Sequence, residues 1–293
     1  MPEATPSLIA VPITASGKAD QAALAEVLMG LAAEDSRCRW TSKDAGKILV
    51  ESIDETHLDH LVGLLKRVLG RSIEIGAPQI LYRETIGSSI EIAYTHKKLT
   101  PSSGEFAKVK LRFAPLAPCQ GVLFESSAPD FPEEYVSGVE RGVQTALAYR
   151  PNAQFPVTDI KATLLDGAYH ATDSSVRAFE LAAQMGTRAG LERAGTVLLE
   201  PLMLVQVVTP TEFVGSVVGD LKSRRGQIRC QHARDDQSVV NARVPLANMF
   251  GYNNQLRSFT GGRGVFTMNF DRYEEVPWGG GDPPFRPAMA MRA

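Results

Sequence analysis

Residues 159–175 have the sequence DIKATLLDGAYHATDSS, in which three local patterns follow one another. Apolar and polar side chains alternate over residues 160–164, which is the period of a half-buried strand. The dipeptide Asp166-Gly167 is typical of a turn. Three residues with good N-cap side chains then precede a helical pattern. The stretch predicts a strand, a polar turn and a returning helix, and the turn would present Tyr169 and His170 outward.

The composition of the whole chain limits the classes of protein to which it can belong. The chain has 293 residues, of which 44% are hydrophobic and 22% charged, values expected of two or three globular units. A net charge of -2 means that any RNA contact must come from local basic clusters. The three cysteines lack the spacing of a zinc site, and their sparseness fits a reducing compartment. With no apolar run of about 18 residues and no basic start, we expect a cytoplasmic protein that does not contact membranes.

Two parts of the chain show the same predicted order of elements, βαββαβ, the ferredoxin-like plan. In residues 1–77 it comprises strands and helices over 8–13, 18–35, 39–43, 47–51, 55–70 and 72–77. In residues 201–276 it begins with a strand over 202–208 and a helix that Thr209 or Thr211 could cap. A hairpin, a second helical segment and a closing strand follow. Residues 277–293 are rich in glycine and proline and are expected to be disordered.

The middle part, residues 78–200, contains the opening stretch. Before it we predict a strand over 89–94, a polar loop over 96–104 and a second strand over 106–113. A helix should then begin near Pro132, with two glutamates at its positive end. The loop would bring Lys97 and Lys98 near the turn that carries His170.

Several runs resemble the elongation factor G family, the translocation GTPases of the ribosome. Residues 159–175 resemble the outer end of the family's fourth domain, and PQILYRETI at 78–86 is similar to the segment that enters it. Fifth-domain signatures are matched by GDLKSRRGQI at 219–228, MFGYNNQLRS at 249–258 and TGGRG at 260–264. The resemblance covers the third, fourth and fifth domains in order, over nearly the whole chain.

The resemblance implies an α+β fold of three small domains. Two ferredoxin-like units, residues 1–77 and 201–276, would flank a βα unit of the kind found in the second domain of ribosomal protein S5, residues 78–200. It also implies a monomeric factor with these partners: ribosomal RNA of both subunits, transfer and messenger RNA in the decoding site, and its own N-terminal GTPase domains. GTP and magnesium would be bound by those N-terminal domains, with no cofactor in this chain.

Two groups of candidate site residues follow from the residue pattern and the resemblance together. The group expected at the decoding site comprises Asp166, Gly167, Tyr169, His170, Lys97 and Lys98. The group expected to bind ribosomal RNA comprises Lys222, Arg224, Arg225, Arg257 and Arg263, where glycines would let the backbone approach a phosphate. The alternative for this second group is that cations end a helix because its dipole favours them there.

Catalytic motifs are absent from the sequence: it has no phosphate-binding loop and no nucleophile elbow, so we expect no enzymatic activity from this chain. His57 and His60 share a helix face, but no third zinc ligand can be chosen, and a solvent-facing polar helix start is the simpler interpretation. The family's glycine- and arginine-rich run is missing from 96–104, and SIDETHLD at 52–59 replaces a glycine-rich family motif. The sequence therefore leaves open a recycling or ribosome-protection paralogue, or a free-standing RNA-binding module.

Overall fold

The computed structural model describes residues 6–15, 17–35, 37–44, 47–100, 103–148, 155–234 and 236–277. Contacts group these residues into two compact units. The first contains residues up to 81 together with 201–271, and the second contains 82–200 together with 272–277. The predicted boundaries after residues 77 and 200 remain predictions, and the predicted disorder of residues 278–293 concerns residues outside the described ranges.

The first unit contains two sheets of the same topology. The elements of the first sheet and its helices are β1 Ile9–Ala15, α1 Lys18–Glu34, β2 Arg39–Asp44, β3 Lys47–Ser52, α2 Glu55–Leu69, β4 Ile73–Ile75 and β5 Gln79–Ile80. The antiparallel strand order is β2-β3-β1-β4, and β5 pairs with the start of β1. This order confirms the predicted ferredoxin-like plan.

Helix α2 shows how the sequence sets the ends of an element. The Asp54 carboxylate accepts a hydrogen bond of 2.8 Å from the backbone N–H of His57, which satisfies one of the unpaired donors of the first turn. Gly70 ends the helix with φ 57°, a conformation that glycine adopts without steric cost. Between these ends, Leu58, Leu61 and Leu65 are buried, as the spacing of the apolar residues predicts.

The second sheet of this unit contains β11 Thr196–Pro210, α5 Val214–Ser223, β12 Gln227–Arg234, β13 Gln237–Pro245, α6 Tyr252–Thr260 and β14 Val265–Glu275. Its order, β12-β13-β11-β14, repeats the first topology, as predicted. The predicted threonine cap is wrong. A 3₁₀ turn, Thr211–Phe213, leads into α5 without a side-chain cap, because the Thr211 hydroxyl lies 3.3 Å from the hydroxyl of Ser238 instead.

Strand β11 is longer than its predicted core of 202–208. Residues 196–199 pair with β6, Arg83–Ile86, and residues 202–210 pair with β13. Pro201 lies between these two pairings.

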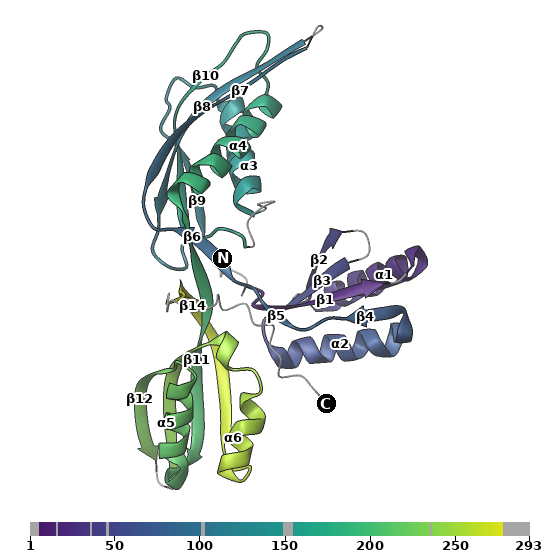
Figure 1. The fold of residues 1–293 in the computed structure, drawn as a ribbon, viewed down its shortest axis with the longest axis vertical. Helices are drawn as coiled ribbons and strands as arrows, with labels where there is room; N and C mark the ends of the chain where they lie inside the picture. Colours follow the sequence, from purple (N-terminus) through teal and green to yellow (C-terminus); the bar gives the residue numbers. More distant parts are fainter. Residues whose placement is uncertain are drawn as a thin grey trace. The chain divides into compact units, whose positions relative to one another are not determined.

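The second unit is built on a sheet of order β7-β8-β10-β9. Its elements are β7 Ile90–Thr100, β8 Ser103–Pro115, β9 Val122–Ser126, α3 Glu133–Ala148, β10 Ile160–Ala168 and α4 Val176–Ala194. Strand β9 runs parallel to β10, with α3 as the crossover between them. Helices α3 and α4 cover one face of the sheet, and the opposite face is open (Figure 1).

The two helices approach each other closely because α3 carries glycines on its contact face. A Cβ atom on Gly138 would lie 2.5 Å from the carbonyl oxygen of Val176, and one on Gly142 would lie 2.2 Å from that of Glu180. Any larger residue at these positions would push α4 away from the core.

Two local predictions in this unit are wrong. Residues 96–100 and 103–104 lie in β7 and β8, so the expected loop is an extension of a regular hairpin. Asp166 and Gly167 lie in β10 and pair with Lys110 and Val109, after a bulge that follows Leu164. The turn therefore begins later than predicted, after Ala168, and the dipeptide that suggested a turn bends a strand instead.

Candidate nucleic-acid interface

The turn 169–174 is tied to both of its neighbours by hydrogen bonds. The backbone N–H of His170 donates to the Ser174 hydroxyl over 2.8 Å, and this hydroxyl donates to the carbonyl of Phe106 in β8 over 2.6 Å. The Phe106 N–H in turn donates to the carbonyl of Asp173 over 2.8 Å. Ser175 then caps α4 by accepting from the N–H of Ala178. The turn is held at a defined place beside β8, rather than hanging as a free loop.

Tyr169 projects from this turn with 53% of its surface exposed. Its ring centroid lies 5.8 Å from that of Tyr135 on α3, and Tyr135 stacks on the buried Phe179 of α4 at 4.6 Å. Gly167 leaves room for the same cluster, because a Cβ there would lie 2.5 Å from the ring of Phe131. The predicted site residues did not include Tyr135. The sequence nevertheless indicates an aromatic cluster here, because Phe131 and Tyr135 are four positions apart near the start of a helix.

His170 is exposed, as the pattern of the stretch predicts. The accessible fraction of its side chain is 59%, and its Nδ1 lies 3.1 Å from the Thr172 hydroxyl and 3.3 Å from the Asp173 carboxylate. These contacts orient one edge of the imidazole toward its own turn. The ring is therefore presented at the surface in a fixed orientation, which suits contact with another molecule more than packing.

Lys97 and Lys98 lie on opposite faces of the sheet, because neighbouring side chains of a strand alternate. Lys98 pairs in register with Glu105 on the face that the helices cover, and this carboxylate also binds His96 over 2.9 Å. The His96 hydrogen bond, with smaller contributions from Lys98 and Arg177, lowers the pKa of Glu105. Lys97 is exposed on the open face, as is Asp166, whose carboxylate accepts from the Gly167 N–H. The predicted decoding-site residues thus divide between two surfaces.

Arg224, predicted to bind RNA, is engaged inside its own unit. Its side chain is 14% exposed and its guanidinium donates to the Asp220 carboxylate over 2.8 Å. Further bonds reach the Asn248 carbonyl and the Gln255 side-chain oxygen, and the group lies 5.0 Å from the ring centroid of Tyr252. Burial, together with the nearby Asp220 charge, raises the pKa of Tyr252. Arg224 therefore joins α5 to the segment around α6, and its RNA contact stays a prediction that this geometry does not favour.

The remaining basic residues of this sheet are more accessible. Lys222, Arg225 and Arg257 are exposed. Arg263 is 57% exposed, pairs with Glu212 and lies 4.8 Å from the ring centroid of Phe213. A Cβ on Gly226 would lie 2.4 Å from the Leu221 carbonyl oxygen, so this glycine closes the end of α5 tightly, and its approach to a phosphate stays a prediction.

The histidine pair on α2 forms no metal site. His57 is buried, with Nδ1 2.7 Å from the Ser52 hydroxyl and Nε2 3.0 Å from the Asp35 carboxylate, whereas His60 is exposed. The expectation of a solvent-facing helix start is therefore wrong for His57. Hydrogen bonds from Arg37 lower the pKa of Asp35. Within the described ranges no three potential ligands come together, and the buried Ser52 has no access to a substrate.

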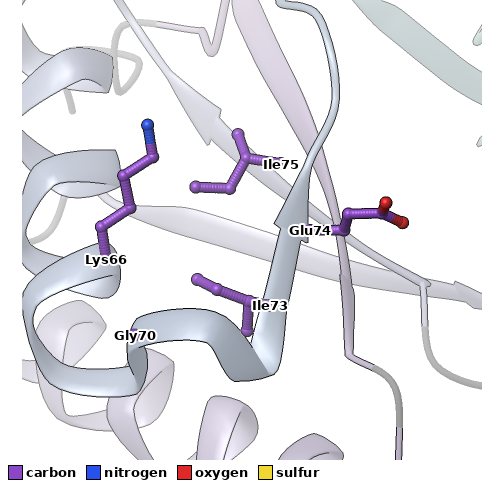
Figure 2. A pocket seen from close by; sticks show the side chains of 5 residues that line it. All are labelled: Lys66, Gly70, Ile73, Glu74 and Ile75. Atoms are coloured by element: carbon purple, nitrogen blue, oxygen red, sulfur yellow. The ribbon is translucent and has the colours of Figure 1, made fainter.

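A shallow depression lies at the end of α2, lined by Lys66, Gly70, Ile73, Glu74 and Ile75. Figure 2 shows the two isoleucines facing Lys66 across it, while the Glu74 side chain points away. A single ammonium group beside apolar carbons offers neither a nucleophile with its base nor a ligand set for a metal. In the same described part of the chain, no helix combines the length and apolar character needed to cross a membrane.

Comparison with known proteins gives two family matches in sequence order. Residues 78–195 match the model described as elongation factor G, domain IV, and residues 197–279 match the model described as elongation factor G C-terminus. Elongation factor G of Paracoccus denitrificans is 50% identical over 273 residues, which cover 92% of this chain and 39% of that protein. Elongation factor G of Ruegeria pomeroyi is 48% identical, with the same two coverages.

A crystal structure of a protein from Thermus thermophilus is similar in fold. It aligns with a TM-score of 0.73 and 34% identity, covering 94% of this chain and 42% of that one. The chain thus spans about two fifths of the length of the relatives that it matches. From the two family matches and the identity to these relatives, the chain belongs to the elongation factor G family and corresponds to the C-terminal part of its members.

Proposed function

We propose that this chain is the ribosome-binding part of a translation factor that promotes movement of transfer and messenger RNA through the ribosome. The observation that carries the proposal is the turn 169–174, which holds Tyr169 and His170 outward from two layers of regular structure. A rigid turn with an exposed aromatic ring and an exposed imidazole can occupy a narrow RNA site without an entropic cost of ordering. Family membership supports the same role.

His170 would contact RNA in the decoding site, by stacking or through a hydrogen bond. Such contacts contribute about 1–3 kcal/mol each, and each 1.4 kcal/mol lost from a transition state slows a step about tenfold. Lys98 lies on the same helix-covered face of the unit and supplies positive charge near the end of the hairpin. Tyr169 would support the contact from its place on Tyr135.

Ribosomal RNA would be bound separately by the sheet of β11–β14, through Lys222, Arg225, Arg257 and Arg263. Their exposure suits phosphate contacts, and the backbone at Gly261-Gly262 is open, because a Cβ on either glycine would meet no other atom within 4 Å. Arg224 would act as a positioning residue that keeps α5 and α6 together.

GTP hydrolysis would reside in N-terminal domains of a longer parent protein, which would supply the GTP and magnesium sites and contact this chain. The chain lacks a phosphate-binding loop in its sequence, so it should bind no nucleotide and act as no enzyme by itself. Titration calorimetry with a non-hydrolysable GTP analogue checks this, and saturable micromolar binding would contradict it. We further infer a monomer that works in the cytoplasm.

The substitution His170→Ala in the full-length parent tests the proposed function. Because the side chain is exposed, the melting temperature and the rate of GTP hydrolysis should remain nearly unchanged. Messenger-RNA movement, followed by a fluorescent label at the end of the message, should slow at least about tenfold. A normal rate of movement, or early melting of the variant, would show that His170 is a structural residue.

A further inference from the structure

The imidazole of His170 contacts its own turn through one ring nitrogen. Its Nδ1 lies 3.1 Å from the Thr172 hydroxyl oxygen and 3.3 Å from the Asp173 carboxylate. For Nε2, on the opposite edge of the ring, the described ranges contain no hydrogen-bond or ion-pair partner. A neutral imidazole carries its proton on one nitrogen and accepts through the other. The contacts at Nδ1 therefore decide what Nε2 offers to a partner molecule.

The Thr172 hydroxyl links Nδ1 of His170 to Asp173. This hydroxyl donates to Asp173 Oδ1 over 3.2 Å. Because it has a single hydrogen, its oxygen must then act as the acceptor at Nδ1. The second carboxylate oxygen, 3.3 Å from Nδ1, can also only accept while the carboxylate is ionised. Both contacts favour a proton on Nδ1.

One contact favours the other tautomer. The backbone N–H of Thr172 points at Nδ1 as a donor from 3.4 Å, which is longer than the usual N–H donor distance of roughly 2.7–3.2 Å. Both partners of this contact are neutral, whereas a hydrogen bond to a charged group is about twice as strong. A lone pair on Nδ1 would also face the Asp173 carboxylate, and the two would repel each other. The balance therefore favours the form with the proton on Nδ1.

Strand β8 fixes Asp173 at both its carbonyl and its carboxylate. The carbonyl accepts from the N–H of Phe106 over 2.8 Å. The carboxylate lies against Gly104, where an added Cβ would be 2.7 Å from its Cγ and 2.9 Å from its Oδ2. Residue 104 has no side chain and so leaves the space that the carboxylate occupies. Even a methyl group there would displace the carboxylate.

We propose that Thr172 and Asp173 are positioning residues, which hold the proton of His170 on Nδ1 so that Nε2 faces outward as a hydrogen-bond acceptor. Gly104 would act through them by leaving room for the carboxylate. The neutral ring would then accept from a hydroxyl or N–H group of its partner, and it would not bind a phosphate oxygen, which has no proton to donate. The inference deepens the proposed function and rests on it for the identity of the partner as RNA, whose donors are ribose 2′-hydroxyls and base N–H groups.

NMR of the 293-residue chain labelled with ¹⁵N-histidine tests the position of the proton, because the chemical shifts of the ring nitrogens distinguish the two tautomers. The chain has five histidines, and the His170→Ala spectrum identifies the signals of residue 170. At about pH 8, where an ordinary imidazole is neutral, the proton of His170 should lie mainly on Nδ1. A proton mainly on Nε2 would overturn the proposal.

Variants of the surrounding residues test which groups hold the proton. Asp173→Asn removes the charge at nearly constant volume and should shift the tautomer ratio about fivefold or more toward the form with the proton on Nε2. Gly104→Ala should shift it in the same direction, although it changes no atom of the turn. Thr172→Val should do so as well, whereas Thr172→Ser keeps the hydroxyl and should resemble the parent chain. Glu192→Gln, an exposed loss of charge near the end of α4, is the control. Equal ratios in Asp173→Asn and Glu192→Gln would show that Asp173 does not position the proton.

Movement of messenger RNA by the full-length parent tests what Nε2 does. His170→Gln keeps an acceptor oxygen, whereas His170→Lys offers donors only. The glutamine variant should therefore be faster than the lysine variant by about tenfold. A lysine variant that is as fast as the glutamine variant would show that no acceptor is needed, and the proposal would be wrong. A message with a 2′-deoxy codon that slows the parent but not His170→Ala would assign the donor to a ribose hydroxyl. The same result with inosine in place of guanosine would assign it to a base amino group.

The outcome can be separated from that of the proposed function. If His170→Ala slows messenger-RNA movement but the proton of His170 lies on Nε2, only the further inference is wrong. If the proton lies on Nδ1 but His170→Ala leaves movement unchanged, the proposed function is wrong. Thermal melting of each variant, expected within a few degrees of the parent chain, excludes loss of folding as the cause.

Discussion

Tyr169 packs on Tyr135 with the ring centroids 5.8 Å apart, so the exposed residue of the turn rests on a residue of α3 that is 34 positions away in sequence. Tyr135 in turn stacks on Phe179 of α4, and Phe131 meets the edge of Phe179 at 5.1 Å. The surface turn is therefore continuous with the core of its unit. This continuity gives a physical reason why a turn outside the core can keep one conformation.

Tyr135→Ala should loosen the turn without unfolding the unit. An aromatic pair contributes about 0.5–1.5 kcal/mol beyond its buried area, so protection of the amides of residues 169–174 against hydrogen exchange should fall by about two- to tenfold. Tyr135→Phe keeps the ring and should behave like the parent chain. Exchange measured by mass spectrometry checks this, and equal protection in all three chains would show that the hydrogen bonds to Phe106 alone hold the turn.

Arg224→Ala should destabilise the sheet of β11–β14 by about 2–4 kcal/mol, because it leaves the largely buried Asp220 carboxylate without its cation. Arg224→Lys should not restore stability, since an ammonium cannot reproduce several fixed donors and the contact with Tyr252. Lys222→Ala, an exposed change on the same helix, is the control and should stay within about 0.5 kcal/mol. Chemical denaturation measures all three. If the Arg224→Ala chain has normal stability but binds RNA more weakly, Arg224 belongs to the RNA-binding group.

The difference between Arg224 and the exposed cations near it shows which features can be predicted from the sequence and which cannot. The strands and helices follow from local periodicity and capping, and both ferredoxin-like sheets were predicted from them. Lys97 and Lys98 were grouped because a polar, turn-rich composition suggested a loop, whereas pairing with β8 extends the strand and sends the two side chains to opposite faces. Whether a surface cation is paired depends on residues distant in sequence, such as Asn248 and Gln255 for Arg224, and no local pattern reveals them.

The stability contributed by Asp35 should depend on pH. Arg37 holds the pKa of Asp35 below its ordinary value of 3.8, so the folded state favours the ionised carboxylate. A lowered pKa contributes stability that is fully present above pH 3.8 and is lost as the pH falls toward the folded-state value. Asp35→Asn should therefore destabilise residues 6–81 at pH 7, and the difference from the parent should shrink below about pH 4. Denaturation curves at pH 7, 5 and 3 check this. A difference that stays constant over that range would mean that Asp35 acts only by its shape.

A substitution at the ion-pair partner of Arg263 tests RNA binding by the sheet of β11–β14 more sharply than the removal of one cation does. Its guanidinium lies between the Glu212 carboxylate and the face of Phe213, so a phosphate must compete with Glu212 for it. If Arg263 contacts phosphate, Glu212→Gln should strengthen binding to a ribosomal RNA helix, and Arg263→Ala should flatten the log-log salt slope by about 0.9. With Lys222, Arg225 and Arg257 also in contact, the parent slope should be about -3 to -4.

Lys161→Ala, in the other unit and paired with Glu125, is the matched loss of charge and should leave the slope unchanged. Affinity that rises in Glu212→Gln even when Arg263 is already alanine would show that the carboxylate repels RNA generally, and the assignment of Arg263 to a phosphate contact would be wrong.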